Sequence, residues 1–223
     1  MTKAASQAPL ARVRDAERTR NDILDVATLE FSDRGYAGAR IDEIAAKTHT
    51  TKRMIYYYFQ SKEGLYVEVL TRAYARIRAA EADLNIEDQD PITAIRRLAE
   101  FTFDHHEAAP DFIRLVGIEN INRGEHLVKA GKLIDLNSPI RILIGRILDR
   151  GQQSGLFRRH IDALDVHMII SAFCIFRVAN RYTFQASFGR DMADPARRDH
   201  YRQMLSDMIV DYLTSDRPAV EPD

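Results

Sequence analysis

The chain has 223 residues, of which 45% are hydrophobic, and its only cysteine is Cys174. This composition is ordinary for a globular protein, and one cysteine excludes an internal disulfide and a zinc site built on cysteines. No apolar run reaches the roughly 20 residues that a membrane-spanning helix needs, and the first residues lack the apolar stretch of a secretory signal. We therefore expect a cytoplasmic protein.

The net charge of -1 hides an asymmetry along the chain. Residues 1–62 carry 11 Lys and Arg against 8 Asp and Glu, whereas the remainder carries 21 against 25. Residues 1–14 contain three basic side chains and no acidic one, and we expect them to form a disordered basic arm. A basic front end on an acidic body is what phosphate contact at one end of a protein requires.

Helical periodicity dominates, and no stretch shows sustained strand-like alternation, which predicts an all-α fold of nine or ten helices. The first clear apolar face starts at Ile23 and ends at Gly35, a plausible helix stop. Short helices follow at about residues 41–45 and 52–59. Ser61 can cap the next helix, which runs to about Leu84.

Later helix starts are marked by a capping side chain directly before a proline. This pattern occurs at Asp90-Pro91, Ser138-Pro139 and Asp194-Pro195. Asp162 can cap a long helix that runs to about Gln185, and a final helix covers about residues 195–214.

The two short helices, with the polar turn between them, form a helix-turn-helix pattern. Ile55 and Phe59 lie four residues apart and share the face that packs inward. The opposite face of the second helix presents hydroxyls and cations at its N-terminus, where unpaired backbone N–H groups also suit phosphates and base edges. We expect this helix to enter the major groove of DNA. The predicted DNA contacts are Arg40, Thr50, Thr51, Lys52, Arg53, Tyr56, Tyr57 and Lys62.

Arg53 and the three consecutive tyrosines leave alternatives open. Arg53 could bond bidentately to guanine O6 and N7, or it could neutralise a phosphate. Three consecutive helical residues cannot share a face, because each step turns the side chain by about 100°. We therefore place Tyr56 and Tyr57 toward phosphates and Tyr58 against the first helix.

Residues 18–65 resemble the N-terminal region of the TetR/AcrR family of transcriptional regulators. The matching residues, in order, are Ile23-Leu24-Asp25, Ala27, Phe31, Gly35-Tyr36, Ile41, Ile44-Ala45, Tyr56-Tyr57, Phe59, Ser61-Lys62-Glu63 and Leu65. The resemblance implies that Thr51, Lys52, Tyr56, Tyr57 and Lys62 grip the DNA backbone. It also implies a homodimer with an effector pocket in the C-terminal body.

The chain departs from the family pattern at three positions. His49 stands in the turn where the family usually has Gly, so a left-handed conformation there would carry a modest cost. Arg53 stands where a small residue is usual, and Tyr58 replaces a frequent His. With the resemblance, the chain divides into a DNA-binding domain at 15–62, a helical effector-binding and dimerisation domain at 63–215, and a disordered tail at 216–223.

The last two predicted helices carry more apolar surface than a lone surface helix needs. Two such helices from each subunit could form a four-helix bundle, although both could instead be buried within one chain. A two-fold axis would present the recognition helices to a palindrome with half-sites roughly 34–36 Å apart. The predicted interface residues are Phe173, Phe184, Tyr201, Leu205, Met208 and Tyr212.

A ligand pocket is predicted from four residues of the body: His105, Phe112, Phe173 and Arg177. A buried cation such as Arg177 needs a partner. It could bind the carboxylate of an aromatic or other organic acid. It could equally pair with Glu119 or Asp104, or line the dimer interface.

Metal and enzyme functions lack motif support. The set His105, His106, Glu119, His126 and His167 contains no HExxH spacing, and adjacent histidines rarely ligate one ion, so we expect no metal site. There is no Gly-rich phosphate loop, no GxSxG elbow and no diagnostic carboxylate pair, so we expect no enzyme and no cofactor. The acidic body argues against a non-specific architectural DNA-binding protein.

The sequence thus predicts a sequence-specific transcriptional regulator, acting as a repressor, that binds a palindromic operator as a homodimer. A small-molecule effector, with an organic or aromatic acid as one candidate, would release it. The alternatives are an activator and a DNA-binding protein that responds to no ligand.

Overall fold

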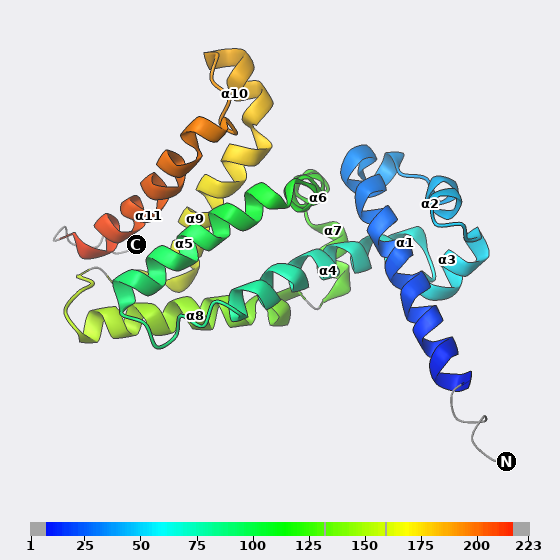
Figure 1. The fold of residues 1–223 in the computed structure, drawn as a ribbon, viewed down its shortest axis with the longest axis horizontal. Coiled ribbons are helices and arrows are strands. Elements are labelled where there is room, and N and C mark those ends of the chain that lie inside the picture. The colour runs from blue at the N-terminus through cyan, green and yellow to red at the C-terminus, as the bar shows by residue number, and fades with distance from the viewer. Residues whose placement is uncertain (1–7, 132, 159, 216–223) are drawn as a thin grey trace. The chain divides into compact units, whose positions relative to one another are not determined.

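The computed structural model describes residues 8–131, 133–158 and 160–215, and these residues form eleven α-helices and one 3-10 turn, with no strands (Figure 1). The predicted all-α fold is confirmed. The count of nine or ten helices was too low for two reasons. The short helix α7 has no clear periodicity of its own, and the long helix expected from Asp162 to Gln185 is two helices.

Contacts between residues group the chain into two compact units. The first takes the described residues up to Ala73 together with Arg114–Gly131, and the second takes Tyr74–Ile113 and the described residues from 133 onward. This grouping differs from the expected boundary at residues 62 and 63. The expected arm at 1–14 overlaps α1, which already begins at Ala8, and residues 1–7 and the tail 216–223 lie outside the described residues.

The first unit contains α1 (Ala8–Gly38), α2 (Ile41–Lys47), α3 (Lys52–Phe59), the first part of α4 (Lys62–Ala82), most of α6 (Pro110–Ile121) and α7 (Glu125–Ala130). Its core is apolar, and Ile23, Phe31, Ile44 and Ile55 have no exposed surface. Burial of four such side chains contributes roughly 1.5–3 kcal/mol each relative to exposure. The predicted core face of these helices is confirmed.

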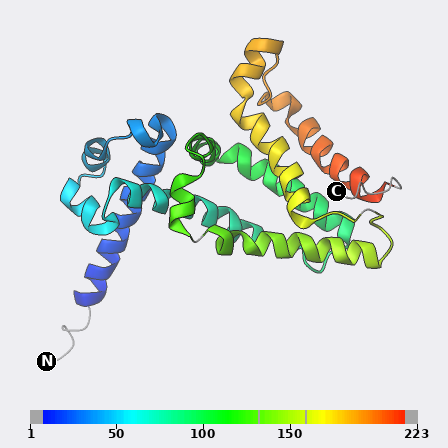
Figure 2. The same cartoon turned by 180° about the vertical axis from the view of Figure 1, so that it is seen from behind.

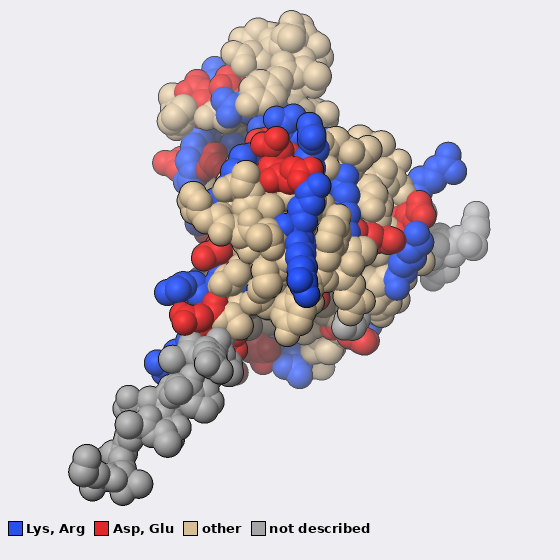
Figure 3. Space-filling model, turned by 90° about the vertical axis from the view of Figure 1, so that its right-hand side faces the viewer, with Lys and Arg blue, Asp and Glu red and all other residues tan. Residues whose placement is uncertain are grey.

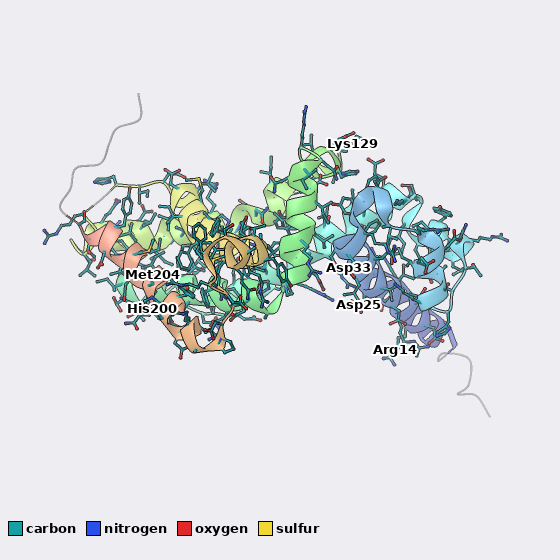
Figure 4. All side chains as sticks on the ribbon, turned by 90° about the horizontal axis from the view of Figure 1, so that it is seen from above. Arg14, Asp25, Asp33, Lys129, His200 and Met204 are labelled. Atoms are coloured by element: carbon teal, nitrogen blue, oxygen red, sulfur yellow. The ribbon has the colours of Figure 1, made fainter. Side chains whose placement is uncertain are left out.

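Ion pairs join α1 to the other helices of the first unit. Asp25 and Asp33 lie along α1, where they pair with Arg72 of α4 and with Arg114 of α6 (Figure 4). Gly35 interrupts regular α1 geometry with a φ of 69°, so the predicted helix stop appears as a kink three residues before the helix ends.

The second unit contains the end of α4, α5 (Pro91–Ala108), α8 (Leu133–Gln153), α9 (Ala163–Ala179), α10 (Arg181–Phe188), the 3-10 turn η1 (Pro195–Arg197) and α11 (Arg198–Thr214). Helix α5 packs against α8, α9 and α11, and their apolar faces form one core. Helices α9 and α11 run side by side, with α10 at one end of the pair (Figures 1 and 2).

Three of the predicted caps of this unit are confirmed, and a fourth is corrected. The carboxylates of Asp90 and Asp162 accept hydrogen bonds from the first backbone amides of α5 and α9, and that of Asp194 does the same for η1. The start predicted at Ser138-Pro139 was wrong. Pro139 lies inside α8 on its exposed side, where solvent can satisfy the carbonyl that loses its N–H partner.

The long helix breaks at Asn180. Helix α9 ends at Ala179, and α10 begins at Arg181 with its axis bent by 68°. Within the described residues, no single helix has the length and apolarity to cross a membrane, and only this bent pair passes by length and composition.

Candidate functional sites

Helix α3 is fixed to the first unit by one face and exposed on the other. Ile55 and Phe59 are buried in the core, as predicted from their spacing. Thr51 is the N-cap residue, and its hydroxyl accepts a hydrogen bond of 3.2 Å from the amide of Met54. The cap and the two apolar anchors set the direction of the helix, so its exposed side chains are presented from a rigid base.

The predicted DNA-contact residues occupy this exposed surface. Tyr57 is 76% exposed and Tyr56 is 43% exposed, whereas Tyr58 is half-buried against the core, as predicted. Arg40, Thr51, Lys52 and Arg53 are also exposed, and Thr50 is half-buried. Figure 3 shows that basic and acidic side chains are interspersed on the side of the protein that lies at the right of Figure 1.

Two cationic side chains among the predicted DNA-contact residues, Lys52 and Arg53, differ in their partners. The ammonium group of Lys52 lies 2.6 Å from a carboxylate oxygen of Asp42 on α2. Arg53, by contrast, forms no hydrogen bond or ion pair with any other described residue. Both side chains of the Lys52 pair are about half exposed, so water and salt weaken their attraction. Arg53 is the guanidinium of α3 that remains available to an external acceptor.

Lys62 lies beyond the end of α3, at the first position of α4. Its ammonium group donates a hydrogen bond of 3.3 Å to the carbonyl of Ala37 and lies 5.1 Å from the centre of the Tyr36 ring. Partial burial lowers the pKa of Lys62. The lysine therefore already holds the kinked end of α1 beside the start of α4.

The turn between α2 and α3 shows the predicted departure from glycine. His49 has a φ of 50°, in the left-handed region that glycine occupies without cost. After α3, the hydroxyl of Ser61 accepts a hydrogen bond from the amide of Gly64, which confirms the predicted cap. A Cβ at position 64 would lie 2.2 Å from the carbonyl oxygen of Phe59, so the junction of α3 and α4 requires glycine there.

The comparison with known proteins identifies this arrangement. A family model described as "Bacterial regulatory proteins, tetR family" matches residues 23–69, and one described as "Tetracyclin repressor-like, C-terminal domain" matches residues 91–209. The chain is 35% identical over 199 residues to the HTH-type transcriptional repressor NicS of Pseudomonas putida, covering 89% of this chain and 94% of NicS. The chain belongs to the TetR family.

Solved structures of transcriptional regulators share the fold. A putative transcriptional regulator from Streptomyces coelicolor, SCO4942, is 29% identical and superimposes with a TM-score of 0.59, covering 85% of this chain and 97% of that one. FadR from Bacillus subtilis, solved in complex with stearoyl-CoA, is 17% identical with a TM-score of 0.64, covering 88% and 98%. As a TetR-family protein, the chain is a DNA-binding transcriptional regulator and not an enzyme, as the sequence predicts.

A buried polar clamp, defined here as Glu119 of α6 with His126 of α7, closes the first unit of this TetR-family chain. One carboxylate oxygen of Glu119 accepts hydrogen bonds from the amides of His126 and Leu127, at 2.9 and 3.2 Å. The other lies 3.0 Å from Nδ1 of His126. The His126 ring packs 4.3 Å from the ring of Tyr36 and 5.0 Å from that of Tyr66. The pairing of Glu119 with His126 is not predicted from the sequence.

Arg177 is buried, and its partner differs from those predicted. Its guanidinium lies 2.7 Å from a carboxylate oxygen of Glu107, donates a hydrogen bond of 2.9 Å to the carbonyl of Met192, and lies 4.0 Å from the centre of the Phe103 ring. The predicted partners Glu119 and Asp104 were wrong, because Glu119 belongs to the clamp and Asp104 pairs with Arg198. These contacts give the buried charge of Arg177 partners within its own chain.

The other predicted ligand residues also lie in the second unit. The rings of His105 and Phe112 lie 6.4 Å apart. Phe173 packs instead against the apolar core around α5 and α9.

The residues predicted for the dimer interface differ in how exposed their side chains are. Leu205 has no exposed surface and lies in the core of its own chain, so its assignment to the interface was wrong. Phe173 and Tyr201 are half-buried against the same core. Phe184 of α10 is half-buried beside the exposed rings of Phe176 and Phe188. Met208 and Tyr212 are exposed on α11, four residues apart.

Sequence reasoning also missed Arg78 and Glu81 of α4, whose side chains are 9% and 5% exposed. The sequence does contain a signal for these two residues. Arg78 follows Tyr74 by four residues and Glu81 follows Ile77 by four, so both continue the inward-facing stripe of their helix.

Proposed function

We propose that this chain is a dimeric repressor that reads a palindromic operator through α3 and releases it when a small molecule binds within the second unit. The observation that carries the proposal is the exposed surface of α3, where an unpaired guanidinium and two tyrosine hydroxyls stand beside a capped helix N-terminus. Such groups bind phosphate oxygens and base edges in the major groove. The repressor name of NicS supports the direction of regulation.

The dimer interface that we propose is an exposed apolar surface on α9 and α11. Leu164, Met168 and Phe176 of α9 are 53%, 61% and 49% exposed, and their spacing in multiples of four places them on one face. Met208 and Tyr212 provide a second exposed stripe on α11, which packs beside α9. A second copy of the chain would bury these stripes in a four-helix arrangement with two-fold symmetry.

The experiment for DNA reading starts with selection of bound sequences from random DNA. The binding of Arg53→Ala is then measured on operators substituted at each base. If Arg53 reads guanine, the variant weakens binding by roughly 10- to 100-fold and loses its preference at one G·C pair. Arg97→Ala is the matched control, because Arg97 is an exposed arginine of the second unit. Uniform weakening at every position would assign Arg53 to phosphate contact instead.

The dimer is tested by sedimentation. Met168→Glu should convert the protein to monomers at micromolar concentration and abolish operator binding, because a charge in an apolar interface is costly. Leu29→Glu is the control, since Leu29 is 54% exposed but lies on α1 in the first unit. A dimer that persists in Met168→Glu would contradict this interface.

A further inference from the structure

A buried polar cluster in the second unit has no role in the fold described above. We call it the Arg78 cluster, and its members are Arg78 and Glu81 of α4, His105 and His106 of α5, and His167 of α9. The side chains of Arg78 and Glu81 are more than nine-tenths buried, and His106 is 4% exposed. Charged and polar groups this deeply buried are normally fully paired.

Arg78 is only partly paired. Its Nη1 lies 3.0 Å from Oε2 of Glu81, one turn further along the same helix. Yet Nε and Nη1 of Arg78 donate no hydrogen bond, and Oε2 of Glu81 accepts none. Burial raises the pKa of Glu81 to about 7, even though Arg78 acts to lower it, so the carboxyl group is only partly ionised at neutral pH. The guanidinium therefore lacks a full counter-charge, and two of its three nitrogens donate no hydrogen bond.

Arg177, in the same unit, is a buried arginine whose charge is paired with a carboxylate of the fold, and it serves as a comparison for Arg78. Nε and Nη2 of Arg177 likewise make no hydrogen bond, but Nη2 lies 2.7 Å from the Glu107 carboxylate on another helix, and a backbone carbonyl accepts from Nη1. Bonds to Arg177 and Arg198 hold the pKa of Glu107 below its ordinary value despite partial burial, so that carboxylate is ionised at neutral pH. Arg78 has no equivalent partner across helices among the described residues.

The histidines of the cluster are neutral at pH 7 and have unused nitrogen atoms. Burial lowers the pKa of His105, His106 and His167, and positive charge acts in the same direction: that of Arg78 on His105 and His167, and that of His105 before that of Arg78 on His106. Nδ1 of His105 and Nδ1 of His106 have no hydrogen-bond partner. A neutral imidazole can donate from one nitrogen and accept at the other. Two ring nitrogens, on histidines that feel the charge of Arg78, are thus available to polar groups of a small molecule.

Aromatic rings surround the same groups. The Phe112 ring lies 5.8 Å from that of His106 and 6.4 Å from that of His105, and it meets Tyr74 edge-on at 5.2 Å. The Phe101 ring lies 5.8 Å from that of His105. Walls of this kind favour a flat body through stacked and edge-to-face contacts.

We propose that the Arg78 cluster binds the effector and that the effector is a small aromatic carboxylate with a single negative charge. Its carboxylate would take the planar fork of Arg78, and a hydroxyl or carbonyl on its ring would meet a histidine. One guanidinium matches one negative charge, so Glu81 would lose its partner and take one proton from solvent as the ligand binds. This inference rests on the proposed ligand-responsive function and names the chemistry of its site.

The experiment is calorimetric titration of the full chain at pH 8 in two buffers of different ionisation enthalpy. The probes are benzoate, 4-hydroxybenzoate and phenylacetate, and benzamide serves as the uncharged control. At pH 8 Glu81 is ionised and the three histidines are neutral, so proton uptake reports on Glu81. We expect at least one of the acids to bind with uptake of close to one proton per site and benzamide not to bind.

Three variants assign the result to residues. Arg78→Met should weaken binding of the acid by about 10- to 100-fold, and Arg78→Lys, which keeps the charge without the fork, should lie between it and the wild type. Glu81→Gln should still bind the acid but take up no proton. Arg97→Met is the control for loss of an arginine elsewhere in the unit, and should bind as the wild type does.

Failure of this proposal can be separated from failure of the proposed function. The site is overturned if none of the three acids binds, if Arg78→Met binds as the wild type does, or if the wild type binds without proton uptake. If Arg78→Met does not fold, Arg78→Lys and Glu81→Gln decide. Operator binding of the same samples is measured separately by fluorescence anisotropy. Acid binding without operator binding would refute the proposed function and leave the site intact.

Discussion

The two units of this chain use arginine in opposite ways. In the first unit, Arg53 is exposed on a helix whose other face is anchored in the core. In the second, the buried side chain of Arg78 interacts with the three histidines of its cluster, and Arg177 is buried against the ring of Phe103. An exposed guanidinium on a rigid helix suits a large polyanion that arrives from solvent. A buried one serves either the fold or a small ligand, and its partners distinguish these roles.

The units also differ in what holds their helices together. Most α5–α11 ion pairs of the second unit are part-exposed, as in the pairs of Arg198 with Asp104 and Glu107 and of Arg96 with Asp207. The clamp of the first unit, Glu119 with His126, is almost fully buried. Exposed pairs contribute little to stability, whereas a buried carboxylate with three partners is costly to remove.

The largest expected effect follows from this difference. Glu119→Ala should lower the free energy of unfolding by about 3 kcal/mol, because two backbone amides and the His126 ring lose their acceptor. Thermal or urea unfolding followed by circular dichroism measures it. Glu125→Ala, on the exposed side of α7, should leave the transition nearly unchanged. Equal effects of the two substitutions would show that the clamp does not stabilise the first unit.

A smaller effect should appear when the second unit is acidified. Burial lowers the pKa of His106 to about 4, from 6.5 in the unfolded chain, so the unfolded state binds the proton first as the pH falls. The stability that neutral His106 provides is complete above pH 6.5 and is lost between pH 6.5 and 4. Glu81 acts in the opposite sense, since its pKa is raised to about 7 and stability falls as the pH rises from 4.5 to 7.

His106→Leu should therefore lose less stability than the wild type between pH 6.5 and 4.5, by on the order of 2 kcal/mol. In this variant His105 and His167 still cause part of the loss of stability at low pH, because their pKa values are also lowered. Unfolding curves at several pH values measure the difference. His200→Leu is the control, since His200 is exposed on α11 (Figure 4). Parallel pH profiles for His106→Leu and the wild type would contradict this account.

The cap of α3 should have an effect of about 1 kcal/mol. Thr51→Ala removes the acceptor of the Met54 amide and should lower stability by that amount and weaken operator binding. Thr51→Ser keeps the hydroxyl and should restore both. If Thr51→Ser behaved like Thr51→Ala, the cap could not be the cause.

The smallest effect concerns the turn before α3. His49→Gly should stabilise the first unit by a few tenths of a kcal/mol, because relief of the left-handed strain slightly exceeds the added flexibility of the unfolded chain. Thr48→Gly, at a φ of -98°, should destabilise it. The unfolding midpoints of the two variants should move in opposite directions from that of the wild type. A shift in the same direction would refute strain at His49.

The sequence predicted the first unit better than the second for a physical reason. The spacing of Ile55 and Phe59, the Ser61 cap and the strained His49 are local features, which depend on residues within one or two turns. Exposure of Tyr56 and Tyr57 follows from the same periodicity. The clamp of Glu119 escaped prediction because its importance depends on how α6 and α7 pack against Tyr36 and Tyr66.

In the second unit, the decisive partners are distant in sequence. Arg177 pairs with Glu107 and not with the predicted Asp104, although both acidic residues lie on α5 within one turn of each other. Leu205 continues the apolar pattern of its helix, but periodicity alone could not tell whether its own chain or a second copy covers it. The Pro139 prediction failed because an interior proline on an exposed helix face resembles a helix start.

The most direct test of the central claim is a competition titration of the wild-type protein. A labelled duplex of the selected palindrome competes with unlabelled scrambled duplex at fixed salt, and sedimentation gives the number of chains bound. We predict two chains per palindrome, or a multiple of two, and a preference of at least about 10³-fold over the scrambled sequence. One chain per duplex, or equal affinity for both sequences, would contradict the claim that paired α3 helices read DNA.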